Sequence, residues 1–345
     1  MKKRGLASDN YAGTFPEIIE AIEQSNKEHA RSYGYDSITE EAIMEFEKIF
    51  GPEIKVSFVF NGTGANVLGI SCVTQSHNGV LCADQSHLYV DESTAPEVFT
   101  GCKYFPLETN SEGKIEPETI RKAVTRRGDE HHPQINTCSI TQPTEYGTVY
   151  TLEELSEIGR TLKELDIIFH MDGARLYNAA LTLNCTFQQM TRDVGVDILS
   201  FGGTKIGLLF GEAIVFFDKN LSKSLKYKQK QTMQLPSKMR FISAQFHRLL
   251  KDELWKKSAS HSNKMAQRLY NSVKDIPQIK ITRPVQSNVV FAVIPTEWNT
   301  PLIDHIPFYV WREQTNEVRW MCSFDTTEKD IDDFVKLIKK LADRT

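Results

Sequence analysis

Three residues with the chemistry of a catalytic site stand directly after expected strands. Asp172 ends an apolar run, where an unpaired carboxylate would cost several kcal/mol, so a positive partner is expected. Lys205 lies between glycines in "GGTKIG", which leave backbone room for a bulky attachment. His87 follows another strand, in "DQSHLYVDE". Because ligands of open α/β sheets bind at the carboxyl ends of the strands, we expect these side chains to lie together.

A fourth feature is the glycine-rich turn "NGTGAN", between an expected strand and an expected helix. Backbone N–H groups at such a turn can approach a phosphate at the start of the helix. Two nucleotide-binding motifs are excluded, because no Walker lysine follows and Val67 replaces the third glycine of the dinucleotide fingerprint. Gly62, Thr63 and Gly64 therefore form either a general phosphate-binding turn or a plain tight turn.

The other three residues also have simpler interpretations when each is taken alone. Asp172 suits a helix cap or an ion pair with Arg175. Lys205 suits a solvated loop, and a single histidine such as His87 is often structural. A shared function is favoured because all four features fall at the same edge of the expected sheet.

Pyridoxal 5'-phosphate would use all four features at once. The cofactor needs a lysine for a Schiff base, an acid beside its pyridine nitrogen and a turn that binds its phosphate. Lys205, Asp172 and the glycine-rich turn supply these groups, and the imidazole of His87 could stack on the ring. The protonated pyridine is then the positive partner that Asp172 requires.

The elements that must position these residues alternate along the chain. Continuous apolar strands are expected at residues 56–60, 79–83, 135–141, 167–172, 197–201 and 212–217. Helices are expected at 39–49, 117–124 and 152–165, the last with a capping box at Thr151 and Glu154. Before them, a capping box at Thr14 to Glu17 predicts a first helix. This alternation predicts an α/β fold with a mainly parallel sheet covered on both faces.

The pattern changes after about residue 217. Helical segments dominate residues 237–274, and short strands follow at 279–282, 288–294, 308–311 and 318–324 before a last helix that starts near Thr327. The sequence therefore predicts a large α/β domain that binds the cofactor (residues 1–250, N-terminal segment included) and a small C-terminal α+β domain (251–345).

Composition reduces the number of partners and locations to be expected. The 345 residues are 40% hydrophobic and 25% charged with a net charge of −4, which does not favour a nucleic-acid or membrane-surface partner. No stretch approaches the length of a membrane span, and no signal peptide is expected. The six cysteines form no metal-ligand spacing, so we expect free thiols, no metal and a cytoplasmic location.

The sequence resembles the threonine aldolase/β-eliminating lyase family of fold-type I pyridoxal-phosphate enzymes, most closely its bacterial low-specificity branch. The stretches that carry the resemblance are "SDNYAG", "FNGTGANVLGI", "TQPTEYGTVYTLEEL", "HMDGARLYNA" and "SFGGTKIG", in this order along nearly the whole chain. The resemblance implies the seven-stranded type of sheet found in fold-type I. It also implies that Lys205 carries the cofactor, Asp172 pairs with the pyridine nitrogen, His87 stacks on the ring and the glycine-rich turn binds phosphate.

Substrate contacts and a shared site are implied by the same resemblance. Arg319 and Arg175 would bind the substrate carboxylate, with Ser8 close by. The family builds its site between subunits, usually of a tetramer, so we expect a homotetramer, a dimer of dimers, with shared active sites. The residues expected to reach a neighbouring site are Tyr33, Lys230 and Arg240.

Strand alternation gives an independent expectation for Arg319. It places Arg319, Met321 and Ser323 on one face and Val318, Trp320 and Cys322 on the other. Since Arg319 is the only cation of this strand, its face should look toward the cleft between the domains.

The implied activity is cleavage of L-threonine or L-allo-threonine, or another β-hydroxy-α-amino acid, to glycine and an aldehyde such as acetaldehyde. Some relatives have a histidine near the substrate hydroxyl where this chain has Glu145, so His87, Glu145 and an ordered water stay open as the base. The alternatives are another β-eliminating lyase, an aminotransferase, or a homologue that binds the cofactor without turnover.

Overall fold

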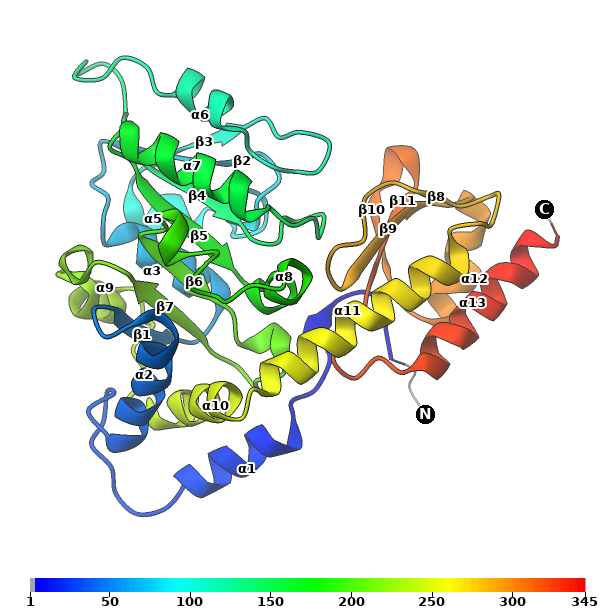
Figure 1. Cartoon of the computed structure of the whole chain (residues 1–345), viewed down its shortest axis with the longest axis horizontal. Helices are drawn as coiled ribbons and strands as arrows, with labels where there is room; N and C mark the ends of the chain where they lie inside the picture. The colour runs from blue at the N-terminus through cyan, green and yellow to red at the C-terminus, as the bar shows by residue number, and fades with distance from the viewer. Residues whose placement is uncertain (1–3, 345) are drawn as a thin grey trace.

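The computed structural model describes residues 4–344 and contains two sheets, each with its own helices (Figure 1). The larger sheet has the strand order β1-β7-β6-β5-β4-β2-β3. Its strands are β1 (Lys55–Val59), β2 (Asn78–Ala83), β3 (Lys103–Leu107), β4 (Gln134–Thr141), β5 (Ile168–Gly173), β6 (Ile198–Phe201) and β7 (Glu212–Phe216). Only β7 runs against its neighbours, β1 and β6, and the other pairs are parallel. The predicted α/β class with a mainly parallel seven-stranded sheet is therefore confirmed.

Ten helices accompany this sheet in the described residues. They are α1 (Pro16–Ser25), α2 (Ser37–Phe50), α3 (Gly62–Ser71), α4 (His87–Val90), α5 (Ala95–Thr100), α6 (Pro117–Ala123), α7 (Leu152–Glu164), α8 (Leu176–Leu183), α9 (Leu225–Gln231) and α10 (Arg240–Lys251). Successive strand residues enter different cores: Leu199 joins the main cluster with Phe46 of α2, whereas Ile198 joins a cluster with Leu68 of α3. Both faces of the sheet are thus buried, which explains its unbroken apolar strands.

The smaller sheet is antiparallel, in the order β10-β11-β9-β8. Its elements are α11 (Leu254–Val273), β8 (Lys280–Ile281), β9 (Val289–Val293), α12 (Asn299–His305), β10 (Tyr309–Arg312), β11 (Glu317–Met321) and α13 (Glu328–Ala342). The long helix α11 runs from the larger body to the smaller one and packs on both α8 and α13 (Figure 1). The domain boundary near residue 250 stays a prediction.

The N-terminal segment also joins the second core. Leu6 is buried among its residues, donates its main-chain N–H to the Pro307 carbonyl (2.7 Å) and accepts the N–H of Met321 (2.7 Å). Residues 6–10 thus cross from the small sheet to the large one. We call this segment the N-terminal strap.

Helix starts show where local sequence suffices. Thr151 and Glu154 form the expected capping box of α7, and Thr327 caps α13 in the same way. The capping box predicted at Thr14 is wrong: Phe15 is the N-cap of α1, and the Thr14 hydroxyl donates to the Gly207 carbonyl (2.7 Å). A tertiary contact has replaced the local one.

Several elements were absent from the sequence expectation, the edge strand β3 and helices α4, α5, α8 and α12 among them. Short 3-10 turns complete the chain: η1 (Asp9–Tyr11), η2 (Arg192–Val194), η3 (Thr204–Ile206), η4 (Lys219–Ser222), η5 (Thr296–Trp298) and η6 (Glu313–Thr315).

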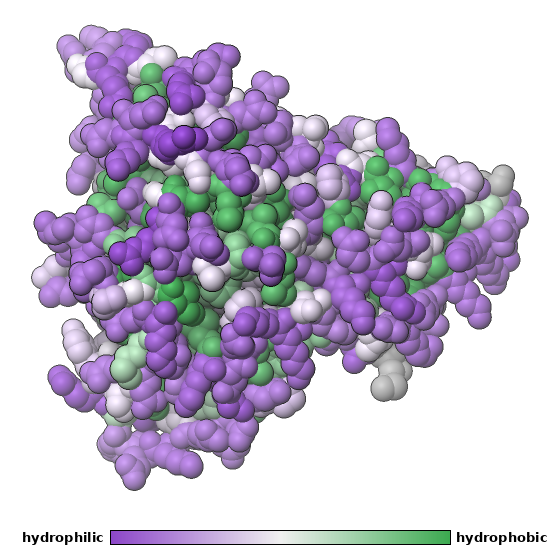
Figure 2. Space-filling model, in the orientation of Figure 1, coloured by the Kyte–Doolittle hydropathy of each residue, from purple (hydrophilic) through white to green (hydrophobic). Residues whose placement is uncertain are grey.

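Hydrophilic residues cover most of the face in Figure 2, and apolar ones come into view mainly between them.

No helix within residues 4–344 is long and apolar enough to cross a membrane. Over the same residues, no cluster of His, Cys, Asp and Glu is arranged to hold a metal ion. The cysteines are all free thiols in the described structure.

Candidate active site

The chemically suggestive residues meet in one cavity of 190 Å³ at the carboxyl ends of β5 and β6. Its lining includes Gly62, Thr63, His87, Asp172 and Lys205. A recess of 40 Å³ shares several of these residues and adds Asn66, Glu92, Glu145 and Arg175. The fold therefore brings together features that are up to 143 residues apart, as the distance from Gly62 to Lys205 in the sequence shows (205 − 62).

Asp172 is held in place by neutral donors. Its Oδ1 accepts the N–H of Ala174 (2.9 Å) and its Oδ2 accepts Nδ2 of Asn66 (2.9 Å), and the residue is 6% exposed. The alternative ion pair with Arg175 is not formed, because Arg175 binds Asp9 instead. A carboxylate has about four acceptor positions, so Asp172 can still accept a proton-bearing ring nitrogen.

The glycine-rich turn forms the first turn of α3. Asn61 is the N-cap and accepts the N–H of Gly64 (2.8 Å), and Gly62 and Thr63 of the same first turn line the cavity. A Cβ on Gly64 would lie 2.3 Å from the end of the Gln234 side chain, so a larger residue would displace that side chain from its hydrogen bond with the Phe60 N–H. The N-terminus of a ten-residue helix with two available amides suits an anion.

Lys205 lies in η3 and is half-buried. A Cβ on Gly202 would lie 2.3 Å from the Ala174 carbonyl, and one on Gly203 would lie 2.2 Å from the Gly211 carbonyl. The glycines therefore permit close packing of the loop against neighbouring backbone. This close packing is a reason for glycine that the sequence did not predict, and room for an attachment at Lys205 stays a prediction.

His87 begins the short helix α4 instead of standing in an irregular loop, and a buried network holds it. Its Nδ1 lies 3.0 Å from Glu92 Oε1, and the same oxygen accepts Asn66 Nδ2 (2.9 Å). The hydrogen bond to the Glu92 carboxylate, with help from Glu145 and Asp172, raises the pKa of His87 against the opposing effect of burial. Sequence reasoning missed Glu92 and Asn66, because neither follows a strand.

Glu145 faces the same recess. Its Oε1 accepts the main-chain N–H of His87 (3.0 Å), and burial together with the charge of Asp172 raises the pKa of Glu145. It belongs to the loop of residues 141–151, where the Gln142 amide makes two hydrogen bonds to the Tyr150 main chain (3.0 Å each). Glu145 is thus fixed beside His87, as a second proton acceptor would need to be.

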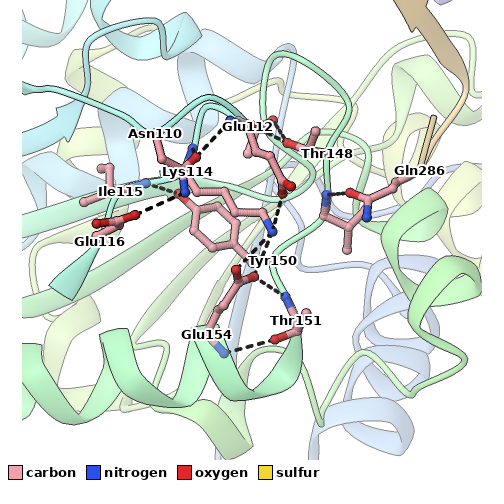
Figure 3. A network of polar contacts seen from close by, with 12 residues as sticks. Asn110, Glu112, Lys114, Ile115, Glu116, Thr148, Tyr150, Thr151, Glu154 and Gln286 are labelled. Carbon is pink, nitrogen blue, oxygen red and sulfur yellow. Dashed lines mark hydrogen bonds and ion pairs between the residues drawn. The ribbon is translucent and has the colours of Figure 1, made fainter. Parts of the chain in front are cut away.

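A polar network outside the site braces this loop (Figure 3). Lys114 is 5% exposed and its Nζ lies 2.9 Å from both Glu112 and Glu154, over the ring of Tyr150. The main-chain N–H of Ile115 donates to the Tyr150 hydroxyl (2.7 Å). A buried lysine with two carboxylates therefore joins the turn at residues 110–115 to the end of the Glu145 loop.

The two arginines both contact the N-terminal strap, Arg175 through Asp9 and Arg319 through Ala7. Arg175 Nε and Nη2 bind the buried carboxylate of Asp9 (2.6 and 2.9 Å), which sequence reasoning missed. Burial, the largest single effect, would raise the pKa of Asp9, but the charge and hydrogen bonds of Arg175, together with Lys205 and Asn288, hold that pKa below its ordinary value. Arg319 Nη2 donates to the Ala7 carbonyl (3.0 Å), and its guanidinium lies over the Trp311 ring at 4.7 Å.

The predicted faces of β11 are confirmed. Val318, Trp320 and Cys322 are fully buried in the small core, whereas Met321 packs with Tyr146 of the large body. Arg319 accordingly points out of its own core. Burial and the nearby Arg175 lower the pKa of Arg319, and its Nε is buried without an acceptor in the described residues.

The remaining predicted residues take other places. Ser8 is buried in the strap, where its hydroxyl accepts the N–H of Asn10 (3.2 Å). Tyr33, Lys230 and Arg240 do not line the Lys205 cavity. Tyr33 and Lys230 line a separate hollow of 800 Å³, with the ammonium 5.5 Å from the ring centre. Arg240 donates to the Glu28 carbonyl (3.2 Å).

These groups fit pyridoxal phosphate. The start of α3 provides amides for a phosphate, Asp172 retains acceptor capacity for a ring nitrogen, and Lys205 opens onto the same cavity. The unpaired Nε of Arg319 suits the carboxylate of an amino acid. Fold and site together define a fold-type I pyridoxal-phosphate enzyme.

Comparisons with known proteins agree with this class. The β-eliminating lyase family profile matches residues 5–296, and the chain belongs to this family. It is 42% identical over 327 residues to the low specificity L-threonine aldolase of a Pseudomonas species (94% of this chain, 93% of the relative). It is 40% identical to the protein of the same name from Pseudomonas aeruginosa over 325 residues (93% of each).

Solved structures give the same result. The Leishmania major threonine aldolase superposes with a TM-score of 0.93 at 28% identity and covers 98% of this chain and 99% of its own. The aspartate aminotransferase of Thermus thermophilus, at 15% identity and a TM-score of 0.69, shares the fold (98% of this chain, 92% of its own).

Proposed function

We propose that the protein is an aldolase that uses pyridoxal 5'-phosphate to cleave L-threonine or L-allo-threonine, or related β-hydroxy-α-amino acids, to glycine and an aldehyde such as acetaldehyde. The observation that carries the proposal is the meeting of Lys205, Asp172 and the start of α3 around one cavity. The relatives named low specificity L-threonine aldolase, which match over nearly the whole chain, support the choice of substrate.

Each residue then has a defined task. When bound, the cofactor supplies an electron sink for breaking the Cα–Cβ bond. Lys205 would hold it covalently, the amides of Gly62 and Thr63 would bind its phosphate, Asp172 would keep its ring nitrogen protonated, and His87 would stack on the ring.

Substrate orientation falls to the arginines. Arg319 binds the carboxylate with its free Nε and the remaining Nη, which fixes the plane of that group. Arg175 contributes charge, since Asp9 already occupies two of its nitrogens. Ser8 lies in the strap that both arginines contact.

The β-hydroxyl proton has two side-chain acceptors in the site. His87 uses Nδ1 for its contact with Glu92, which leaves Nε2 for the substrate. Glu145 uses Oε1 for the His87 amide, which leaves Oε2 for the substrate. An ordered water is the third acceptor. Comparison of His87→Asn with Glu145→Gln distinguishes them, because loss of the base costs about 10²- to 10⁴-fold in rate.

The decisive experiment measures acetaldehyde release from L-threonine by the purified chain, and identifies by peptide mass spectrometry the lysine that borohydride reduction links to the cofactor. We expect acetaldehyde release and label on Lys205, with both lost in Lys205→Ala and retained in Lys226→Ala, an exposed lysine outside the cavity. Label without acetaldehyde would indicate a different amino-acid reaction or no turnover, and label on another lysine would reject the site.

We also propose a cytoplasmic homotetramer, a dimer of dimers, with sites shared between subunits. The support is the hollow lined by Tyr33, Tyr35, Tyr227 and Lys230, whose three tyrosines are 44%, 64% and 62% exposed, and a glycine-rich turn with no cation of its own. Arg240 lies on a neighbouring helix. Sedimentation of the holoenzyme tests it, and an active monomer would reject it.

A further inference from the structure

One buried carboxylate of the cofactor cavity has no part in the functions described so far. Glu212 is the first residue of β7, and it lines the same cavity as Lys205 and Asp172. The reversed direction of β7 explains its place. Glu212 pairs with Val59, the last residue of β1, so the beginning of β7 lies at the edge where the parallel strands end.

The Glu212 side chain is bound to the loop that leads into Lys205. Glu212 Oε2 accepts the main-chain N–H of Gly203 (2.5 Å), and Oε1 lies 3.4 Å from the N–H of Thr204. The first contact is short and the second is long, so the Gly203 bond is the stronger. These two amides belong to the residues immediately before Lys205, at the start of η3.

The loop itself leaves little freedom for another arrangement. A Cβ on Gly203 would lie 2.2 Å from the Gly211 carbonyl, and the N–H of Gly211 donates to the Thr204 hydroxyl (3.2 Å). Glu212 therefore closes a tight structure that both ends of the loop share. Without its carboxylate, two largely buried amides before Lys205 would lack an acceptor.

A carboxyl group such as that of Glu212 is unusual at a position with only 8% exposure. No ion pair joins it to a cation anywhere in residues 4–344. Burial raises the pKa of Glu212 to about 7, and Thr204, Lys205 and the loop amides oppose this effect. A buried carboxyl group without an ion-pair partner costs stability, so its presence beside Lys205 calls for a functional explanation.

We propose that Glu212 is a positioning residue for Lys205: its carboxylate holds the amides of Gly203 and Thr204 and so sets the backbone conformation from which the lysine side chain reaches the cofactor. In that conformation the Lys205 amine condenses with the aldehyde of the cofactor and releases one water molecule. This inference rests on the proposed role of Lys205.

The test uses the full-length chain, freed of cofactor and reloaded with pyridoxal phosphate. The attachment rate is measured by borohydride quenching at set times, followed by mass spectrometry of the Lys205 peptide. For Glu212→Ala we expect the rate to fall by about tenfold or more, as for loss of a hydrogen bond to a charged group. Glu212→Gln keeps an oxygen that can accept the Gly203 N–H, and should restore most of the rate.

Asp197 provides a matched control. Its Oδ2 accepts the N–H of Phe169 (2.8 Å) at the other end of β5 and β6, away from the cavity. Asp197→Ala should lose stability without slowing attachment. Hydrogen exchange of the chain without cofactor gives a second measurement: protection of residues 202–211 should fall in Glu212→Ala and stay unchanged in Asp197→Ala.

The outcomes separate this inference from the proposed function. If the unaltered chain is labelled at a lysine other than Lys205, the proposed function fails. If Lys205 is labelled but Glu212→Ala attaches cofactor at the unaltered rate with unchanged loop protection, the role of Glu212 is overturned alone. Equal slowing in Glu212→Ala and Asp197→Ala would overturn it too, because the effect would then be general loss of stability.

Discussion

The two arginines beside the site differ in how far the fold itself uses their N–H groups. Arg175 gives Nε and Nη2 to Asp9, and Nη2 also lies 3.2 Å from the Met321 sulfur. Arg319 gives only one nitrogen to a carbonyl, that of Ala7, and its buried Nε has no acceptor in the described residues. One guanidinium is neutralised within the protein and the other is not.

The difference assigns different tasks to residues that look alike in the sequence. A buried guanidinium needs an anion, and Arg175 has one, so it serves mainly to anchor the strap between the two sheets. The pKa of Arg319 is lowered by burial and by Arg175, which means that its charge is unfavourable until an anion arrives. A substrate carboxylate would supply that anion.

The largest effect on stability should follow from breaking the ion pair between Asp9 and Arg175. Asp9→Ala leaves Arg175 buried without an anion and should lower the free energy of unfolding by about 3–5 kcal/mol, measured by urea denaturation at pH 7. The pKa of Asp9 lies below its ordinary 3.8, so its contribution is present above that pH and is lost as the pH falls through the folded-state pKa. Equal stability of the two proteins at pH 7 would show that the pair is not structural.

Arg319→Lys tests the guanidinium whose Nε has no acceptor in the described residues. The variant keeps the charge but loses the planar guanidinium with its paired N–H donors. The kcat/KM for L-threonine should therefore fall by the equivalent of about 1.5–3 kcal/mol, while cofactor binding and stability stay unchanged. Arg175→Lys is the matched comparison and should mainly lose stability. If the two variants lose the same kcat/KM and the same stability, the distinction between the arginines is wrong.

A third test applies the same reasoning to a histidine whose charge is paired. Glu92→Gln removes the anion at Nδ1, so the pKa of His87 should fall, as followed by NMR titration of the imidazole. Because the raised pKa of His87 exceeds the ordinary 6.5, the pair stabilises the fold below that pH and loses this contribution as the pH rises through the folded-state pKa. An unchanged titration would remove Glu92 from the account of His87.

The smallest effect should come from the aromatic support of Arg319. Trp311→Leu removes the ring that lies 4.7 Å from the guanidinium and should raise KM by the equivalent of about 0.5–1 kcal/mol with little change in kcat. Tyr309, at 5.4 Å, still partners the cation in that variant. A large fall in kcat would instead place Trp311 in contact with the reacting groups.

Much of the site was predictable because its signals are local. Asp172, Lys205 and the glycine-rich turn each follow an apolar strand, and a strand end is recognisable within about ten residues of sequence. Glu92 and Asn66 carry no such signal, since one follows α4 and the other lies inside α3. Asp9 stands next to the predicted Ser8, yet its partner is 166 residues away.

The sequence by itself determined the alternation of strands and helices, the capping boxes of α7 and α13, and the edge of the sheet that carries the chemistry. These features depend on periodicity and on neighbouring residues. Only the tertiary structure decided that Thr14 binds Gly207, that Arg175 belongs to Asp9 and that Glu212 reaches the Lys205 loop. The physical reason is strand order: β7 enters the sheet reversed between β1 and β6, and no local pattern of side chains encodes that place.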